Sequence, residues 1–558
     1  MSKKIVIVGG VAGGASTAAR LRRRDEHAKI VLLESGPYIS FANCGLPYYI
    51  GGVITDRDEL LVMDEESFED RFCVDVRPMN EARSIDRAKK TVQVLDKKTG
   101  ETYNEPYDQL VLATGSAPLR PPVPGIDGER IFTLWNMEDT DILKAYIDET
   151  KPKKAVVVGG GFIGIEMAEN LVHLGMDVTL VEMMPRCMAH LDHDMAEVLH
   201  EELLKNGVEP RLGRKVVRFS DDGGEKLVEL DDGNKIPCDI VLLSMGVRPR
   251  SELAKEAGLS LNGRGGIVTD GMLRTSDENI YAVGDVIEVN HFVSGEKTMI
   301  PLAGPANKQG RLCADNLMGD GKTYAGTQGS SVAKVFDMTA ASTGMNTEQI
   351  EAGGQVFGTD FFAVKTYAWS HATYYPGAER FAIKLLYTKE GKILGAQAVG
   401  EQGVDKRIDV IATAMRLGGT IYDLTALELC YAPPYSSAKD PVNMLGFMAE
   451  NHLSGKVRFI HYNELGKLDP TKTIYLDVRE GFEVEEGGIA QATHIPLGEL
   501  RERMGELDKR KTIVVFCAIG HRANVASRIL MQNGFDEVYV YAGGYSTYSQ
   551  MADIVSGS

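Results

Sequence analysis

One structural unit occurs twice in this chain: a buried strand, a glycine-rich turn, a helix, a second strand and a terminal acid. The first copy, "KKIVIVGGVAGGASTAARLRR" with "AKIVLLES", ends in Glu34, and the second, "KKAVVVGGGFIGIEMAENLVHLGMDVTLVEMMP", ends in Glu182. This order, with an acid about 20 residues after the turn, is typical of a dinucleotide-binding unit. The glycines let the backbone approach a pyrophosphate at a helix N-terminus, and the acid accepts hydrogen bonds from ribose hydroxyls. The chain is therefore predicted to be an α/β protein with two Rossmann-like domains that bind two dinucleotides.

The two turns differ in how closely they follow the G-x-G-x-x-G pattern. The second turn satisfies it with Gly159, Gly161 and Gly164, whereas Val11 takes the middle position of the first. The predicted cofactor-binding residues of the first turn are Gly9, Gly10, Ala12, Gly13 and Gly14.

Two further strands are expected to end beside the first turn. The stretch "YDQLVLATGSAP" leads into Thr114 and Gly115, and "NIYAVGDVIEV" leads into Gly284 and Asp285. A carboxylate that follows a strand can bind a ribityl hydroxyl of a flavin, or it can simply cap a loop. The residues alone leave both readings of Asp285 open.

The remainder of the chain has a different pattern. After about residue 325, "SSVAKVFDMTAASTG", the hairpin "RFAIKLLYTKEGKILGAQAVG" and the helix "VDKRIDVIATAMRLG" predict an α+β domain, and the last hundred residues alternate strands with helices. The predicted organisation is a first dinucleotide domain at 1–113 and 271–325, a second at 114–270, an α+β domain at 326–450, a linker at 451–460 and a small α/β domain at 461–558.

Composition restricts the class of protein. The net charge of −18 argues against nonspecific binding to nucleic acid or to an anionic membrane surface. The N-terminal stretch has no apolar signal-peptide region, and no later apolar run is long enough to span a bilayer. The seven cysteines are scattered without metal-ligand spacing, which predicts reduced thiols, no metal site and a cytoplasmic location.

Several motifs carry a family resemblance. "SFANCGLPYYIGG", "ATGSAP", "YAVGD" and "YAPPYSSAKDPVNMLG" resemble single-cysteine flavoprotein disulfide reductases, coenzyme A-disulfide reductases in particular. "LDVRE" and "CAIGHR" resemble a rhodanese domain, although Gly488-Ile489 stands where such domains often have His-Ile. Almost the whole chain is thus similar to coenzyme A-disulfide reductase–rhodanese fusions, some of which reduce persulfides with NADH. The resemblance implies FAD in the first unit, a nicotinamide nucleotide in the second, a dimerisation domain in the α+β region, a coenzyme A substrate and a homodimer.

Cys44 is the first predicted catalytic residue. No second cysteine lies within ten residues, so a sulfur bonded to Cys44 must come from a substrate disulfide or persulfide. Asn43 before it and Pro47 after it predict a helix start, where a thiol pKa is lowered. The alternative, a buried apolar cysteine, is disfavoured by the motif. A peroxide substrate is also disfavoured, because relatives that reduce peroxide or oxygen carry a histidine where this chain has Ala12.

Phosphate binding is predicted on the first helix. Arg20, Arg23 and Arg24 share one helical face, and their planar guanidinium groups suit phosphate. The same pattern is also expected for a helix surface that only faces solvent. The resemblance favours substrate and extends it to further positions. The residues it implies for substrate are Arg20, Arg23, Ser40, Asn43, Arg71 and Lys439, and for catalysis Tyr374 and Tyr431, both supplied by the other subunit.

Cys517 is the second predicted catalytic residue. The loop from Cys517 to Arg522 precedes a helix, so its amides can surround a thiolate or persulfide, and Arg522 is expected to orient the loop and bind an anionic donor. Asp477 and Arg479 are expected to brace this loop. The remaining cysteines are expected to be core residues: Cys73, Cys187, Cys238, Cys313 and Cys430.

Three functions are consistent with these residues. The first is reduction of coenzyme A disulfide, coenzyme A persulfide or polysulfide, with NADH favoured because Glu182 would repel a 2′-phosphate, although nearby Arg186 keeps NADPH open. The second is a sulfur carrier or redox sensor that passes persulfide from Cys517 to a protein partner. The third is an NADH oxidase or peroxidase, which Ala12 disfavours.

Overall fold

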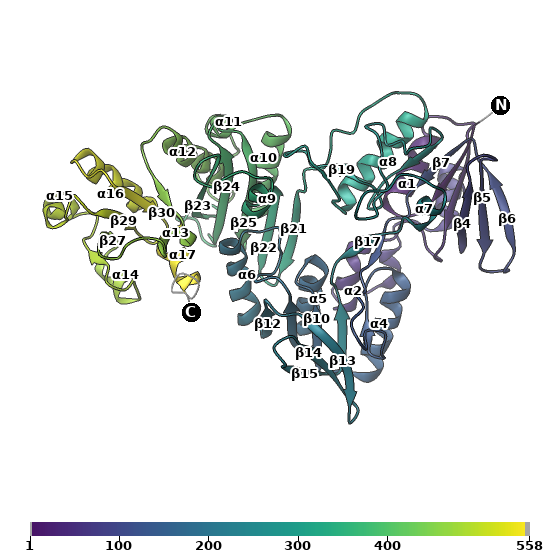
Figure 1. Ribbon diagram of the computed structural model, residues 1–558, viewed down its shortest axis with the longest axis horizontal. Helices are drawn as coiled ribbons and strands as arrows, with labels where there is room; N and C mark the ends of the chain where they lie inside the picture. The colour runs from purple at the N-terminus through teal and green to yellow at the C-terminus, as the bar shows by residue number, and fades with distance from the viewer. Residues whose placement is uncertain (1–2, 553–558) are drawn as a thin grey trace. The chain divides into compact units, whose positions relative to one another are not determined.

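The computed structural model describes residues 3–552, which form two compact units (Figure 1). The first unit contains residues up to 184 together with 207–329, and the second contains 185–206 and the residues from 330 onward. None of the helices in the described residues is both long enough and apolar enough to cross a membrane.

The first parallel sheet of unit 1 has the strand order β18-β7-β1-β2-β3. Its strands are β1 Lys4–Val8, β2 Lys29–Glu34, β3 Asp75–Pro78, β7 Gln109–Leu112 and β18 Ile280–Ala282. The apolar run of β1 is buried along its length, as expected for a strand covered on both faces. Helices α1 (Ala12–Arg22) and α8 (Ala303–Leu317) lie side by side (Figure 1), and Gly310 permits this because a Cβ there would lie 2.4 Å from the Gly13 carbonyl oxygen.

The second parallel sheet of unit 1 repeats this plan in the order β12-β11-β10-β16-β9. Its strands are β9 Ile131–Phe132, β10 Lys154–Val158, β11 Asp177–Glu182, β12 Val208–Leu212 and β16 Ile240–Leu243. Helix α5 (Phe162–His173) joins β10 to β11. The prediction of two Rossmann-like domains is confirmed by these two sheets.

Smaller elements surround the two sheets of unit 1. The antiparallel strands are β4 Asn80–Asp86, β5 Thr91–Asp96 and β6 Thr102–Pro106; β13 Val216–Asp222, β14 Glu225–Leu230 and β15 Lys235–Cys238; β8 Ser116–Pro118 with β17 Val247–Pro249; and β19 Val289–Asn290 with β20 Lys297–Thr298. The helices are α2 Leu46–Ile50, α3 Glu65–Phe72, α4 Met137–Thr150 and α7 Glu252–Glu256, with 3-10 turns at Asn43–Gly45 and Arg57–Leu60.

Unit 2 begins with the predicted α+β domain. Its antiparallel sheet has the order β21-β22-β25-β24-β23, with strands β21 Ser331–Val335, β22 Met338–Gly344, β23 Phe361–Trp369, β24 Arg380–Thr388 and β25 Ile393–Gly400. The accompanying helices are α6 His193–Lys205, α9 Thr347–Ala352, α10 Val404–Arg416, α11 Ile421–Ala426 and α12 Pro441–Leu453. Both the hairpin β24–β25 and the helix α10 fall where the sequence predicts them.

The C-terminal part of unit 2 is a parallel sheet of order β26-β30-β29-β27-β28 between helices. Its elements are β26 Phe459–Ile460, α13 Tyr462–Leu465, β27 Thr473–Asp477, α14 Gly481–Glu485, β28 Thr493–His494, α15 Leu500–Arg503, a 3-10 turn Met504–Glu506, β29 Thr512–Phe516, α16 His521–Gln532, β30 Val538–Tyr541 and α17 Gly544–Gln550. The small α/β domain is therefore confirmed. Residues 454–458 separate α12 from β26, which is a shorter connection than the expected linker.

A buried group of charges holds α6 against the antiparallel sheet of unit 2. Lys384 Nζ lies 2.8 Å from carboxylate oxygens of both Asp192 and Asp194, and Lys365 Nζ lies 3.2 Å from Asp194. All four side chains are nearly inaccessible to solvent. Two cations and two carboxylates thus neutralise one another inside the protein, where an unpaired charge would be strongly destabilising.

Candidate active sites

The first glycine turn brings the backbone unusually close to a neighbouring strand end. Gly9 has a φ of +103°, and a Cβ there would lie 2.2 Å from the carbonyl oxygen of Ala113. A Cβ on Gly14 would lie 1.8 Å from the Gly9 oxygen, so both positions require glycine. The Gly10 amide donates to Glu34 Oε2 at 2.8 Å, which places the acid beside the turn. The two remaining predicted residues, Ala12 and Gly13, form the first turn of α1.

The predicted residues after β7 and β18 lie at the same edge of this sheet. β18 pairs with β7, so Thr114-Gly115 and Gly284-Asp285 follow neighbouring strand ends. Ser116 Oγ donates to Asp285 Oδ2 at 3.0 Å, and burial raises the pKa of Asp285. The carboxyl edge of a doubly wound sheet is where such folds bind ligands.

The second glycine turn reproduces the geometry of the first. Gly159 has a φ of +109°, and a Cβ there would lie 2.3 Å from the Ser244 oxygen. A Cβ on Gly164 would lie 1.8 Å from the Gly159 oxygen. The Gly160 amide donates to Glu182 Oε2 at 2.6 Å.

Both turns have the features that a dinucleotide requires. Gly115 and Gly161 each face open space, since an added Cβ would meet no atom within 4 Å. Each turn starts a helix, whose free amides and dipole favour an anion. The residues present therefore fit a dinucleotide at each of the two turns.

Cys44 lies in the 3-10 turn Asn43–Gly45, directly before the short helix α2. The residue is exposed, yet its pKa is raised, first by desolvation from the atoms packed around it and then by the charges of Glu166 and Asp285. The expectation of a lowered thiol pKa is therefore wrong for this structure. α2 contains only five residues, and its effect on the thiol pKa is outweighed by desolvation and then by the charges of the two acids.

Glu166 was not identified from the sequence as a site residue. It lies on α5, accepts a hydrogen bond from Tyr48 at 3.4 Å, and burial raises its pKa to about 7. The available signal was a pair of acids, Glu166 and Glu169, within a mostly apolar helix. Such a carboxyl changes charge near neutral pH next to the thiol.

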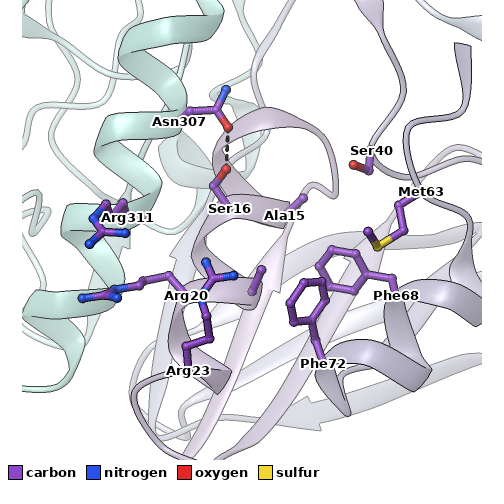
Figure 2. Close-up of a pocket in the computed structure, with 11 residues that line it drawn as sticks. Ala15, Ser16, Arg20, Arg23, Ser40, Met63, Phe68, Phe72, Asn307 and Arg311 are labelled. Atoms are coloured by element: carbon purple, nitrogen blue, oxygen red, sulfur yellow. Dashed lines mark hydrogen bonds between the residues drawn. The ribbon is translucent and has the colours of Figure 1, made fainter.

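A pocket of about 350 Å³ lies between α1, α3 and α8 of unit 1. Figure 2 shows the guanidinium groups of Arg20, Arg23 and Arg311 on one side and the rings of Phe68 and Phe72 on the other. The other lining residues are Ala15, Ser16, Ala19, Ser40, Met63 and Asn307. Three arginines beside two aromatic rings can bind phosphate groups and a flat ring together.

Two of the three pocket arginines are oriented by contacts with other side chains. Arg20 Nε donates to Asp315 Oδ1 at 2.8 Å, and the Arg23 guanidinium lies 5.9 Å from the centre of the Phe72 ring. Arg24, which was expected on the same helical face but lies just beyond the end of α1, is held by Asp315 and Asp320. Arg311 was missed because nothing in the sequence relates α8 to α1.

The other predicted substrate residues lie elsewhere. The Asn43 amide donates to the Trp135 carbonyl at 3.3 Å, and Arg71 is exposed near the end of α3. Neither lines the pocket. Lys439 is exposed in unit 2.

Tyr374 and Tyr431 come together in unit 2 although they are far apart in the chain. Their hydroxyl oxygens are 2.7 Å apart, and both side chains are exposed. The pair is a ready source of hydroxyl donors on a surface of the dimerisation-type domain.

Cys517 lies in the loop between β29 and α16 and is 1% exposed. The Gly520 amide donates to its Sγ at 3.2 Å, which supports the expected amide-lined loop. The Arg522 guanidinium lies beside the Cys517 sulfur but is already paired, because its Nη1 and Nη2 each donate to Glu483 at 2.6 Å.

Asp477 and Arg479, which were expected to brace the Cys517 loop, form a buried pair that contacts the neighbouring segment 483–487. Arg479 donates to both Asp477 oxygens, and also to the carbonyl oxygens of Glu483 and Gly487 at 3.0 and 2.7 Å. Both charged side chains are buried. Arg479 thereby fixes the segment that carries Glu483.

The remaining cysteines divide into two groups. Cys187, Cys238 and Cys313 are buried, as expected, and burial raises the pKa of Cys238 to about 12. Cys73 and Cys430 are exposed, so their assignment to the core is wrong. Each of these two residues lies at the end of an element or in a loop, a position that local hydrophobicity does not reveal.

Comparison with known proteins covers nearly the whole chain. Residues 3–310 match the family described as pyridine nucleotide-disulphide oxidoreductase, 330–441 its dimerisation domain, and 462–551 the rhodanese-like domain. The coenzyme A disulfide reductase of Staphylococcus haemolyticus is 36% identical over 451 residues, which is 80% of this chain and all of that protein.

Two solved structures resemble the chain from end to end. Reduced CoADR-RHD of Bacillus anthracis has a TM-score of 0.96 and 48% identity, covering 99% of each chain. An NAD-dependent persulfide reductase from A. fulgidus has a TM-score of 0.91 and 39% identity, covering 98% of this chain and all of that one.

Proposed function

This chain belongs to the pyridine nucleotide-disulphide oxidoreductase family, and we propose that it is an FAD-containing enzyme that uses NADH to reduce sulfur bound to coenzyme A. The proposed substrates are coenzyme A persulfide or polysulfide and coenzyme A disulfide. The observation that carries the proposal is the presence of two different thiols in one chain. Cys44 is exposed in the first dinucleotide domain, and Cys517 accepts a hydrogen bond from a backbone amide in the rhodanese-like domain.

A coenzyme A substrate is supported by the pocket of unit 1. Arg23 and Arg311 offer cations to phosphate groups, Arg20 lines the same pocket while paired with Asp315, and Phe68 and Phe72 offer apolar rings. Ser40, also in the lining, is four residues from Cys44, so one segment reaches both the pocket and the thiol. Coenzyme A has a long, thin arm between its phosphates and its sulfur, which suits a site where the phosphates bind in the pocket and the sulfur reacts at Cys44.

Cys44 is proposed to form a covalent bond with substrate sulfur. Its thiolate attacks one sulfur of the donor, a new S–S bond to Cys44 forms, and the donor S–S bond breaks to release a thiolate or hydrosulfide. Flavin and nicotinamide, when bound, supply the two electrons that later cleave the new bond. Glu166, with a pKa of about 7, is placed to take up or release a proton beside Cys44.

The leaving sulfur also needs a proton or hydrogen bond. Tyr374 and Tyr431 are proposed to provide it from the other subunit of a homodimer, with the two hydroxyls acting together. The match of residues 330–441 to a dimerisation domain supports this assembly.

NADH is proposed as the reductant. Glu182 lies against the second glycine turn, where its carboxylate would repel a 2′-phosphate. Arg186 is occupied: it donates to both oxygens of Glu348 at 2.7 Å and to the Leu191 carbonyl at 2.8 Å. That leaves little reason to assign it to a 2′-phosphate.

The proposal is tested by anaerobic NADH oxidation with equal concentrations of coenzyme A persulfide and coenzyme A disulfide. Turnover that Cys44→Ser abolishes supports it, and faster turnover on persulfide with release of sulfide identifies a persulfide reductase. Faster turnover on the disulfide would identify a thiol-homeostasis enzyme. Rapid NADH consumption with only oxygen or peroxide would instead make the chain an oxidase or peroxidase.

A further inference from the structure

The charge around Cys517 differs from what a site for small anions requires. The two arginines nearest the loop in the sequence motifs are both neutralised: Arg479 by Asp477 and Arg522 by Glu483. The segment 477–488, which supplies both acids, carries five carboxylates against one arginine. Neither arginine is therefore a free cation beside the loop.

The pair between Arg522 and Glu483 is a strong one. Both hydrogen bonds measure 2.6 Å, and they form a two-pronged contact between a planar guanidinium and a carboxylate. The side chains are 30% and 19% exposed, so solvent screens the pair only in part. Arg522 also interacts electrostatically with Cys517, which places the neutralised cation beside the sulfur.

Glu483 is itself held in place from several sides. Its carboxylate accepts from the Glu480 amide at 3.0 Å in a capping box that starts α14, and its carbonyl accepts from Arg479. A donor anion would have to displace the Glu483 carboxylate to reach the Arg522 guanidinium.

We propose that Glu483 is a specificity-determining residue which, by neutralising Arg522, makes the Cys517 loop select organic persulfides over small dianions such as thiosulfate. The inference rests on the proposed function, because it names the donor class of the same rhodanese-like domain. A persulfide on a long arm, such as that of coenzyme A, brings its sulfane sulfur to Cys517 while its phosphates stay far from the acids. Thiosulfate carries both negative charges on the reacting molecule itself and meets the carboxylates directly.

The transfer step balances without an external oxidant or reductant. The Cys517 thiolate attacks the outer sulfur of R–S–SH, and a bond forms between Sγ and that sulfur. The bond between the two donor sulfurs breaks, its electron pair stays on the inner sulfur, and the proton moves there to give R–SH. Cys517 is left as a persulfide anion, which the Gly520 amide can stabilise.

The test measures formation of the Cys517 persulfide in a single turnover of the full-length holoenzyme, by rapid quench and mass spectrometry. Cys44→Ser is the background, so that Cys44 does not consume the donor. Thiosulfate and coenzyme A persulfide are the two donors. Glu483→Gln keeps the shape and the capping acceptor, whereas Glu485→Gln, an exposed acid of the same segment, is the matched control.

With Glu483→Gln we expect the thiosulfate rate to rise about tenfold, the effect of one freed charge-assisted contact. The rate with coenzyme A persulfide should change less than about twofold, and added salt should accelerate thiosulfate transfer only where Glu483 is present. Glu485→Gln should leave both rates near those of the background. A Glu483→Gln variant that slows both donors equally, or leaves their ratio unchanged, overturns the proposal.

The two proposals fail in distinguishable ways. The single-turnover experiment lacks Cys44 and does not involve NADH. Absence of NADH oxidation with every sulfur donor in the unmodified enzyme would refute the proposed reductase function, and the donor selectivity at Cys517 would still be measured independently.

Discussion

Replacing Glu166 with glutamine tests how the surroundings of Cys44 set its reactivity. Glu166 raises the pKa of the Cys44 thiol by its charge, and burial raises its own pKa to about 7. Glutamine removes the charge and can still accept the hydrogen bond from Tyr48. The variant should therefore have a lower Cys44 pKa and a larger thiolate fraction, but only at pH values where Glu166 is ionised.

The pH range follows from the Glu166 pKa. A carboxyl with a pKa of about 7 is about one tenth ionised at pH 6 and about nine tenths ionised at pH 8. The ratio of Cys44 alkylation rates, Glu166→Gln over unmodified enzyme, should be close to one at pH 6. It should rise through its midpoint near pH 7 and approach a plateau above one at pH 8.

The assay is alkylation by iodoacetamide after reduction with NADH, with the Cys44 peptide quantified by mass spectrometry between pH 5.5 and 8.5. Cys73, an exposed thiol of the same chain, serves as the internal reference, and its ratio should stay at one throughout. A Cys44 ratio that does not change with pH, or that falls below one as pH rises, would refute the electrostatic reasoning.

Three further predictions address the nucleotide sites, the buried charges and the second thiol. Gly9→Ala should lose FAD, measured by the visible absorption spectrum, because the strained φ costs about 1–3 kcal/mol even before the clash with Ala113. Gly159→Ala should keep FAD and raise the KM for NADH. Equal loss of flavin in both variants would contradict separate roles for the two turns. Lys384→Met leaves Lys365 alone to balance the two buried carboxylates of Asp192 and Asp194 and should cost about 3–5 kcal/mol in calorimetry of the holoenzyme, while exposed Lys389→Met should have almost no effect. Similar melting of both variants would count against the buried cluster. Cys517→Ser should abolish persulfide transfer without changing NADH oxidation on coenzyme A disulfide, and unchanged turnover on every sulfur donor would separate Cys517 from the reaction.

Much of the fold and the positions of both thiols could be predicted from the sequence. The glycine turns, their acids and the Cys517 loop are each formed by residues close together in the chain, so their geometry follows from local backbone requirements. Gly9 and Gly14 illustrate this, because the contact that a side chain would block is made within one strand–turn–helix segment or with an adjacent strand end.

The predictions that failed depend on distant residues. The helix start predicts a lowered pKa for Cys44, but in the folded chain desolvation raises this pKa, and the charges of Glu166 and Asp285, which come from other parts of the chain, raise it further. Cys73 and Cys430 were placed in the core because most lone cysteines are buried, and only packing decides whether a particular one is covered.

The two dinucleotide folds, the family and the positions of the two thiols proposed to react can be read from the amino-acid sequence, because each is encoded by a contiguous pattern. The surroundings of those thiols become apparent only in the folded chain. Arg311 of α8 lines the same pocket as Arg20 and Arg23, and Arg522 pairs with Glu483, which is 39 residues away in the chain. The energies of charges and of buried groups depend on distance and solvent exposure in space, and neither quantity can be read from positions along the chain.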